Sequence, residues 1–237
     1  MATSRRKPSR TVLTAGIYAL TAAAATAAGA SGNGRLAAWT KPLPMLVLGA
    51  ATATAIREEG THPVDAALLV GAIGFSTAGD RAMLLEEFGT DEHTRERHLA
   101  VGAGLFAGAQ ASLCALLLRR GARLHARTLV PRTALLGESA AILATKNPAA
   151  LTVLGPYGNS LAVMSALASD APQPQPALRV GGLLFVLSDL AIINRRYLLT
   201  GTRSRTLAEA WVLGSYFAAQ WLLVTSLSTP KPAAHSG

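Results

Sequence analysis

Long apolar stretches follow one another along this chain and limit the folds that it can adopt. Half of the 237 residues are hydrophobic and 15% are charged. Stretches of about 20 apolar residues can cross a bilayer as helices, and only helices and closed barrels satisfy the backbone there. We therefore predict an all-α, polytopic membrane protein. Eight apolar blocks give about eight transmembrane helices: 11–30, 36–56, 64–86, 97–118, 129–145, 148–168, 177–200 and 206–227.

The two ends of the chain differ from this apolar region. Residues 1–10 are predicted to form a basic tail, 11–228 a single membrane domain and 229–237 a C-terminal tail. The basic start and the alanine-rich run to Ala30 imitate a secretory signal peptide, but the run has the length of a span, so we expect a retained first helix. The basic tail and the arginines of residues 119–132 favour cytoplasmic termini, in the bacterial inner membrane.

Two aspartates lie within the apolar blocks: Asp80 in GFSTAGD and Asp189 in LLFVLSD. A charged aspartate at the bilayer centre costs ~2.5–3.5 kcal/mol on the lowest scale, so a functional role is the default explanation. In one poorly hydrated cavity two such groups repel, and one should hold its proton while the other ionises. That combination supplies an acid and a base. Alternatively, each aspartate only bonds a serine or a carbonyl between helices.

The surroundings of the two aspartates repeat. Gln110 follows Asp80 by 30 residues in Phe-x-x-Ala-Gln, and Gln220 follows Asp189 by 31 residues in Tyr-x-x-Ala-Gln. This order predicts two tandem four-helix repeats around a central polar cavity, related by an axis along the membrane normal. Both acids should then face each other at similar depth. A lysine also opens a helix ahead of each aspartate: Lys41 and Lys146.

Further polar residues are candidates for binding substrate. Ser76 lies one helical turn before Asp80 and projects from the same face. Lys41 could pair with Asp80 or hold a substrate phosphate as a point charge, or it could snorkel to the interface. The amides of Gln110 and Gln220 could contact substrate or only bridge helices.

Other kinds of site and partner are not indicated. The histidines lack HExxH spacing and no glycine-rich phosphate loop occurs, so we expect no metal and no cofactor. Gly137-Glu-Ser139 is only loosely similar to a nucleophile elbow, because it lies in a helical segment. The lone Cys114 reads as a buried thiol. The net charge of +9 comes from arginines in connections, which suits anionic lipid headgroups rather than nucleic acid.

Several short motifs occur in order across residues 41–220: KPLPM from Lys41, FSxxGD ending at Asp80, FxxAQ ending at Gln110, Tyr157 with Met164, LFxxSD ending at Asp189 and YxxAQ ending at Gln220. Together they resemble the YhhN-like lysoplasmalogenase family. The resemblance implies an eight-helix membrane enzyme that hydrolyses the vinyl ether bond of lysoplasmalogens to a fatty aldehyde and glycerophospho-ethanolamine or glycerophospho-choline. It also implies that Asp80 and Asp189 are the essential acids, and it adds Tyr157 to the candidate substrate-binding residues.

We expect acid-catalysed hydration, in which one aspartate protonates the vinyl carbon and the other stabilises the oxocarbenium ion and activates water. The expected partners are a lysophospholipid substrate and membrane lipid. The main alternative is a proton-coupled transporter of small molecules or lipids that uses the aspartates as a proton relay. A third is a structural or regulatory membrane protein, in which neutralising both aspartates is harmless.

Overall fold

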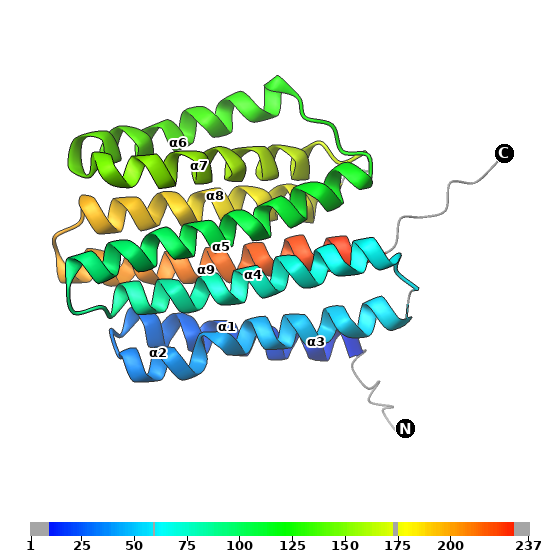
Figure 1. The fold of residues 1–237 in the computed structure, drawn as a ribbon. Coiled ribbons are helices and arrows are strands. Elements are labelled where there is room, and N and C mark those ends of the chain that lie inside the picture. The colour runs from blue at the N-terminus through cyan, green and yellow to red at the C-terminus, as the bar shows by residue number, and fades with distance from the viewer. Residues whose placement is uncertain (1–9, 59, 173–174, 230–237) are drawn as a thin grey trace, which may run out of the picture.

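The computed structural model describes residues 10–58, 60–172 and 175–229, and the secondary structure of this part is entirely helical. This confirms the all-α prediction. The helices lie side by side along one direction as a bundle, with α6 and α7 at one edge and α1 to α3 at the other (Figure 1). They are α1 (Arg10–Ala30), α2 (Gly34–Thr40), α3 (Pro42–Glu58), α4 (Pro63–Glu87), α5 (Glu92–Arg119), α6 (Ala126–Lys146), α7 (Pro148–Ser169), α8 (Pro176–Tyr197) and α9 (Thr202–Ser228).

One predicted helix is divided in two. The stretch 36–56 begins as the short α2 and continues as α3, and the division falls at Lys41. The Lys41 N–H still donates to the carbonyl of Ala37 at 2.9 Å. Pro42 has no N–H to continue the ladder, but its fixed φ suits the first position of a new helix. The break sets Lys41 at the start of α3.

Side-chain caps and prolines set the other helix starts. Asp91 Oδ1 accepts a hydrogen bond from the Thr94 N–H at 2.8 Å, so α5 begins at Glu92, five residues before the predicted start at 97. Asn147 Oδ1 caps α7 by accepting from the Ala150 N–H at 3.1 Å. Prolines occupy the first helical position where an N–H would have no partner: Pro63, Pro148 and Pro176.

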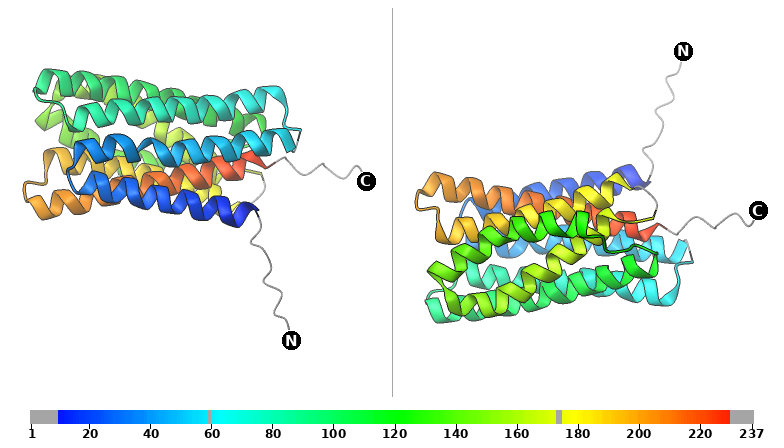
Figure 2. Two further views of the ribbon diagram at one scale, coloured as in Figure 1. Left: turned by 90° about the horizontal axis from the view of Figure 1, so that it is seen from below. Right: turned by 90° about the horizontal axis from the view of Figure 1, so that it is seen from above.

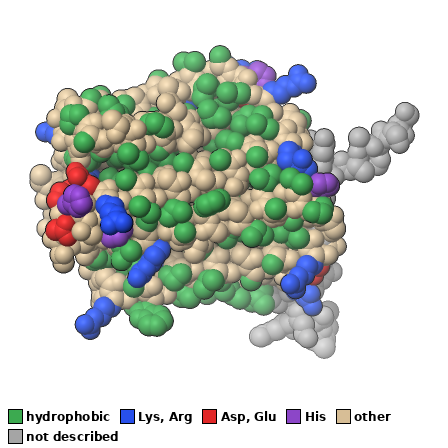
Figure 3. Space-filling model, in the orientation of Figure 1, with side chains coloured by type: hydrophobic (Ala, Val, Ile, Leu, Met, Phe, Trp, Pro, Cys, Tyr) green, Lys and Arg blue, Asp and Glu red, His purple; other side chains and the backbone are tan. Residues whose placement is uncertain are grey.

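Five helices, α1, α4, α5, α8 and α9, are long and apolar enough to cross a membrane. On the face shown in Figure 3, charged side chains lie toward the two ends of the bundle, and the wide band between them is hydrophobic or uncharged. Large apolar side chains point outward from these helices, such as Leu20 (73% exposed) and Val70 (58%). Such a band suits lipid. Spanning by α3, α6 and α7, which would complete eight crossings, stays a prediction.

The first and last described residues, Arg10 and Thr229, lie at the same end of the bundle (Figures 1 and 2). We call this the terminal end. The opposite, distal end carries the connections from α1 to α2, α4 to α5, α6 to α7 and α8 to α9. This placement is the one expected for an even number of spans. The internal repeat and the division into tails and membrane domain stay predictions.

Three aromatic rings from α5, α8 and α9 fix these helices against one another. Phe106 and Phe185 each meet the Tyr216 ring edge to face, with centroids 5.8 Å apart in both pairs. Phe106 and Phe185 meet in the same manner at 6.3 Å. Gly79 brings α4 close, because a Cβ there would lie 2.9 Å from the Phe106 ring. The two aspartate helices, α4 and α8, therefore pack around one aromatic centre.

Candidate active site

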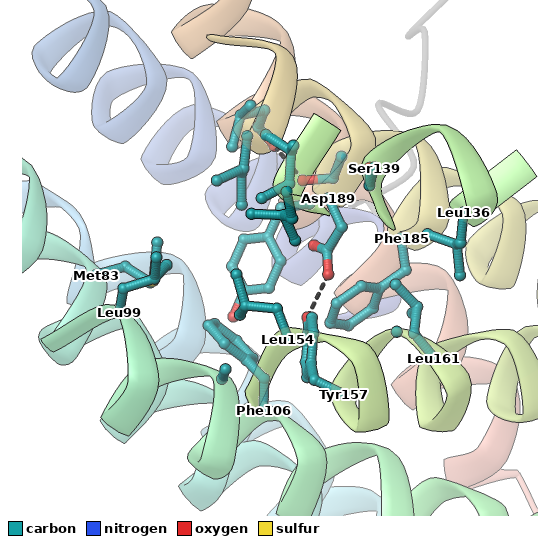
Figure 4. A pocket seen from close by; sticks show the side chains of 18 of the residues that line it. Met83, Leu99, Phe106, Leu136, Ser139, Leu154, Tyr157, Leu161, Phe185 and Asp189 are labelled. Carbon is teal, nitrogen blue, oxygen red and sulfur yellow. Dashed lines mark hydrogen bonds between the residues drawn. The ribbon is translucent and has the colours of Figure 1, made fainter. Parts of the chain in front are cut away.

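A cavity of about 270 Å³ lies inside the distal half of the bundle. Asp80 from α4 and Asp189 from α8 both line it. Asp80 lies seven residues before the end of α4 and Asp189 eight before the end of α8, so a rise of ~1.5 Å per residue puts both roughly 10–12 Å from the distal helix ends. Most of the remaining wall is hydrophobic (Figure 4) and includes Met83, Leu99, Phe106, Leu136, Leu154, Leu161 and Phe185. The structure thus brings the two acids together; their catalytic role stays a prediction.

Each aspartate accepts a hydrogen bond from a tyrosine of another helix. Tyr216 Oη of α9 donates to Asp80 Oδ2 at 2.8 Å. Tyr157 Oη of α7 donates to Asp189 Oδ2, as the dashed line in Figure 4 shows. Among the described residues no hydrogen bond reaches Oδ1 of either aspartate. Each phenol therefore fixes a carboxyl group by one oxygen and leaves the other for a substrate atom or water.

Lys41 also lines the cavity, from the break between α2 and α3. It lies close enough to Asp80 to interact with it electrostatically. Within the described part of the chain, no carboxylate lies within the 4.0 Å ion-pair distance of its ammonium group. The lysine is therefore available to an anionic group that enters the cavity.

Three of the predicted substrate-binding residues lie behind the cavity wall. Gln220 Nε2 donates to Ser76 Oγ at 2.9 Å and ties α9 to α4. Gln110 Oε1 accepts from Ser160 Oγ and ties α5 to α7. Ser76, Gln110 and Gln220 are almost fully buried and do not line the cavity, unlike Tyr157. Their binding of substrate stays a prediction, and their position suits holding together the helices that surround the cavity.

The cavity wall also contains a tyrosine and three charged residues that were not among the predicted site residues: Tyr216, Glu87, Arg195 and Glu209. The two Ala-Gln motifs differ at their first residue, which is Phe106 in one copy and Tyr216 in the other. This extra hydroxyl was the sequence signal that could have identified Tyr216. The others, Glu87, Arg195 and Glu209, lie near helix ends and read as ordinary interfacial charges. Only the tertiary contacts show that they border the cavity.

Ser139 of α6 lines the cavity too, and its Oγ has no hydrogen-bond partner among the described residues. A serine nucleophile needs an adjacent base. No histidine of the described chain lines the cavity, so these residues form no Ser–His pair there. In the same residues no group of three or more His, Cys, Asp or Glu side chains is placed to hold a metal ion.

A third aspartate, Asp170, caps α7 at the terminal end, away from the cavity. Its Oδ2 accepts hydrogen bonds from the Thr128 hydroxyl and from the His125 N–H, the latter at 3.3 Å. Burial alone would raise the pKa of Asp170, but these hydrogen bonds outweigh it and hold the pKa below its ordinary value. Asp170 is therefore a structural carboxylate and a natural control for the two cavity aspartates.

The chain was also compared with known protein families, curated proteins and solved structures. A model of the YhhN family matches residues 36–227, which include both cavity aspartates and Lys41. Neither curated proteins nor solved structures gave a match.

Proposed function

The chain belongs to the YhhN family, and we propose that it is a membrane hydrolase of lysoplasmalogen-type lysophospholipids. It would cleave the vinyl ether bond and release a fatty aldehyde and a glycerophospho-headgroup. One observation carries the proposal: two carboxyl groups from different helices, Asp80 and Asp189, line one cavity whose wall is otherwise largely apolar. Such a cavity admits a lipid chain and presents an acid and a base beside it.

The proposed reaction consumes one water. A carboxylic acid gives its proton to the vinyl carbon farther from the ether oxygen, and the π electrons form the new C–H bond. This leaves an oxocarbenium ion, which the second, ionised carboxylate stabilises. Water adds to the charged carbon and gives its proton to that carboxylate. The hemiacetal then breaks its bond to the headgroup oxygen, which takes the proton held by the second carboxyl group, while the hemiacetal hydroxyl returns its proton to the first; aldehyde and alcohol result, and both carboxyl groups regain their starting states. The balance requires no redox partner and no cofactor.

The surroundings of the two aspartates differ, and we assign their roles from this difference. Lys41 interacts electrostatically with Asp80, and an ammonium group stabilises a neighbouring carboxylate. Asp80 is therefore the ionised partner that stabilises the oxocarbenium ion and accepts the proton of water. Asp189 also accepts a hydrogen bond from a tyrosine, Tyr157, but no cation of the described chain acts on it as Lys41 acts on Asp80, so we assign Asp189 as the proton donor.

The rest of the cavity fits the remainder of such a lipid. Leucines of α6 and α7, including Leu136, Leu154 and Leu161, would surround the alkenyl chain. The exposed apolar band and the five helices that could cross a bilayer support a membrane location, from which a lysolipid could enter directly. We further propose eight crossings of the bacterial inner membrane with cytoplasmic termini, since the basic segments near the terminal end favour that side.

The test is aldehyde release by the purified protein in nanodiscs from a 1-alkenyl lysophospholipid. Asp80→Asn and Asp189→Asn should each lower kcat at least 100-fold, the lower bound for general acid–base catalysis. Asp170→Asn, the matched change outside the cavity, should keep its rate. The saturated 1-alkyl analogue should not be cleaved, because it has no double bond to protonate.

Aldehyde release at near wild-type rate by both cavity variants would refute the mechanism. If no variant and no wild-type sample releases aldehyde, the transport alternative takes precedence. It predicts proton uptake into liposomes that depends on the same two aspartates.

A further inference from the structure

One hydroxyl group of the cavity wall has no hydrogen-bond partner in the described part of the chain: Ser139 Oγ of α6 (Figure 4). The residue is buried, with 8% of its surface exposed. Among the described serines and threonines, Thr61 has the only other unpaired buried hydroxyl, and it does not line the cavity. A buried polar atom without a partner costs free energy and calls for an explanation.

Other buried serines of the bundle show what a hydroxyl does when it serves only its own helix. Ser228 Oγ donates to the Val224 carbonyl, four residues earlier, at 2.8 Å. Ser215 Oγ donates to the Trp211 carbonyl in the same way at 2.6 Å. Ser139 also lies inside a helix, with a carbonyl four residues earlier, but makes no such bond. Its hydroxyl is therefore directed to something other than its own backbone.

Apolar residues surround Ser139 on the cavity face of α6. Leu136 lies three residues before it and Leu143 four residues after it, and both line the cavity together with Ala140. An alkenyl chain that contacts this face would gain nothing from a hydroxyl, because the hydroxyl would lose its water without finding a partner. The polar group therefore suits a polar ligand within an otherwise apolar part of the wall.

Ser139 lies at the same depth as the two cavity aspartates. It lies seven residues before the distal end of α6, as Asp80 does on α4, and Asp189 lies eight residues before the end of α8. At a rise of ~1.5 Å per residue, all three are roughly 10–12 Å from the distal helix ends. The hydroxyl is thus at the level at which bonds form and break in the proposed reaction.

We propose that Ser139 binds the water molecule that adds to the oxocarbenium ion. This rests on the proposed function and adds a residue to its machinery. A serine hydroxyl can donate a hydrogen bond to water and accept one from it, and a buried water needs about two to four polar partners. Asp80 Oδ1, which receives no hydrogen bond within the described residues, is a second partner. The water oxygen forms the new C–O bond, and Asp80 takes its proton.

Competition between water and methanol tests this water site. If methanol adds to the oxocarbenium ion, its oxygen forms the new C–O bond, its proton goes to the carboxylate, and a mixed acetal results instead of the aldehyde. With a 1-alkenyl lysophospholipid in buffer that contains methanol, Ser139→Ala should raise the ratio of acetal to aldehyde about 2- to 12-fold, the range expected for one lost hydrogen bond. The KM for the lipid should not change. The ratio is independent of the amount of folded protein, so a destabilised variant still gives a result.

Two further variants separate the hydrogen bond from the space that the hydroxyl fills. Ser139→Cys fills nearly the same volume with a weaker hydrogen-bonding group, so it should raise the ratio as well. Ser228→Ala removes a similarly buried hydroxyl outside the cavity and should leave the ratio unchanged.

Three results would overturn the water site alone. They are a wild-type ratio in Ser139→Ala, a ratio that rises in Ser139→Ala but not in Ser139→Cys, and a raised KM at an unchanged ratio, which would assign the hydroxyl to the lipid. If the wild type consumes no substrate and forms neither product, the proposed function itself is overturned, and this role of Ser139 with it.

Discussion

The hydroxyl of Tyr216 offers a perturbation that separates chemistry from folding. Tyr216→Phe removes the single hydrogen bond given to Asp80 Oδ2 at 2.8 Å. It keeps the ring, and with it the edge-to-face contacts to Phe106 and Phe185. The cavity should therefore keep its shape while the Asp80 carboxyl group loses the contact that fixes its orientation.

The expected magnitude follows from this single contact. A hydrogen bond to a charged group contributes about 1.5–3 kcal/mol, and each ~1.36 kcal/mol corresponds to a tenfold change in rate. If Asp80 is ionised when the oxocarbenium ion forms, kcat/KM for aldehyde release should fall about 10- to 150-fold. The free energy of unfolding should also fall by about 1–3 kcal/mol, because a buried acceptor loses its partner.

Tyr18→Phe provides the matched control. The Tyr18 hydroxyl is equally buried and donates to the Phe217 carbonyl at 2.7 Å, but it does not line the cavity. This variant should lose stability and keep its catalytic rate. The assay pairs steady-state aldehyde release with thermal unfolding in the same detergent. If Tyr216→Phe retains wild-type kcat/KM, or if both variants lose activity in parallel with stability, the reasoning about Asp80 fails.

Two further predictions concern stability alone and are read by thermal unfolding. The wild type should have a larger free energy of unfolding than Asp170→Asn at every pH above 3.8, the ordinary pKa of an aspartate, and this difference should disappear as the pH falls further. The reason is that the hydrogen bond from Thr128 lowers the pKa of Asp170 in the folded protein, so the unfolded chain takes up the proton first. A difference in stability that does not change with pH would contradict this. Gly182→Ala should cost about 1–3 kcal/mol by overpacking, since its Cβ would lie 3.1 Å from Ser165 Cα of α7. Gly214→Ala, with nothing within 4 Å, should be nearly neutral, and equal losses in the two variants would disprove the packing argument.

Most of the helical framework was predictable because its signals are local. A proline in the first helical turn and a capping side chain act within a few residues of a helix start. The start of α7 at Pro148 therefore coincides with the expected one, and the start of α8 at Pro176 lies one residue before it. A helix start at Lys41-Pro42 was expected, whereas the separate short helix α2 before it was not, because residues 36–56 were treated as one apolar block. The start of α5 at Glu92 was missed because the first turn of this helix is charged and was left outside the apolar block. The capping residue Asp91 was the signal for the earlier start.

The depth of the two aspartates could also be predicted, since an acid in an apolar block has few structural explanations. Their hydrogen-bond partners could not. Tyr157 and Tyr216 reach Asp189 and Asp80 from helices 32 and 136 residues away in sequence, and no periodicity encodes such a pairing. The same holds for Glu209, which lines the cavity only because α9 packs beside α8 and its carboxylate pairs with Arg195.

The off-centre position of the acids has a consequence for where the lipid comes from. Asp80 lies seven residues from one end of α4 and 17 from the other, so under the proposed function the vinyl ether would approach from the half of the bilayer nearest the distal end. A substrate held in the other leaflet would have to flip before it could react. The water-soluble product would leave on the distal side, opposite the chain termini, while the aldehyde would stay in the membrane. In vesicles that carry the substrate in only one leaflet, activity should therefore depend on whether that leaflet faces the distal end of the protein.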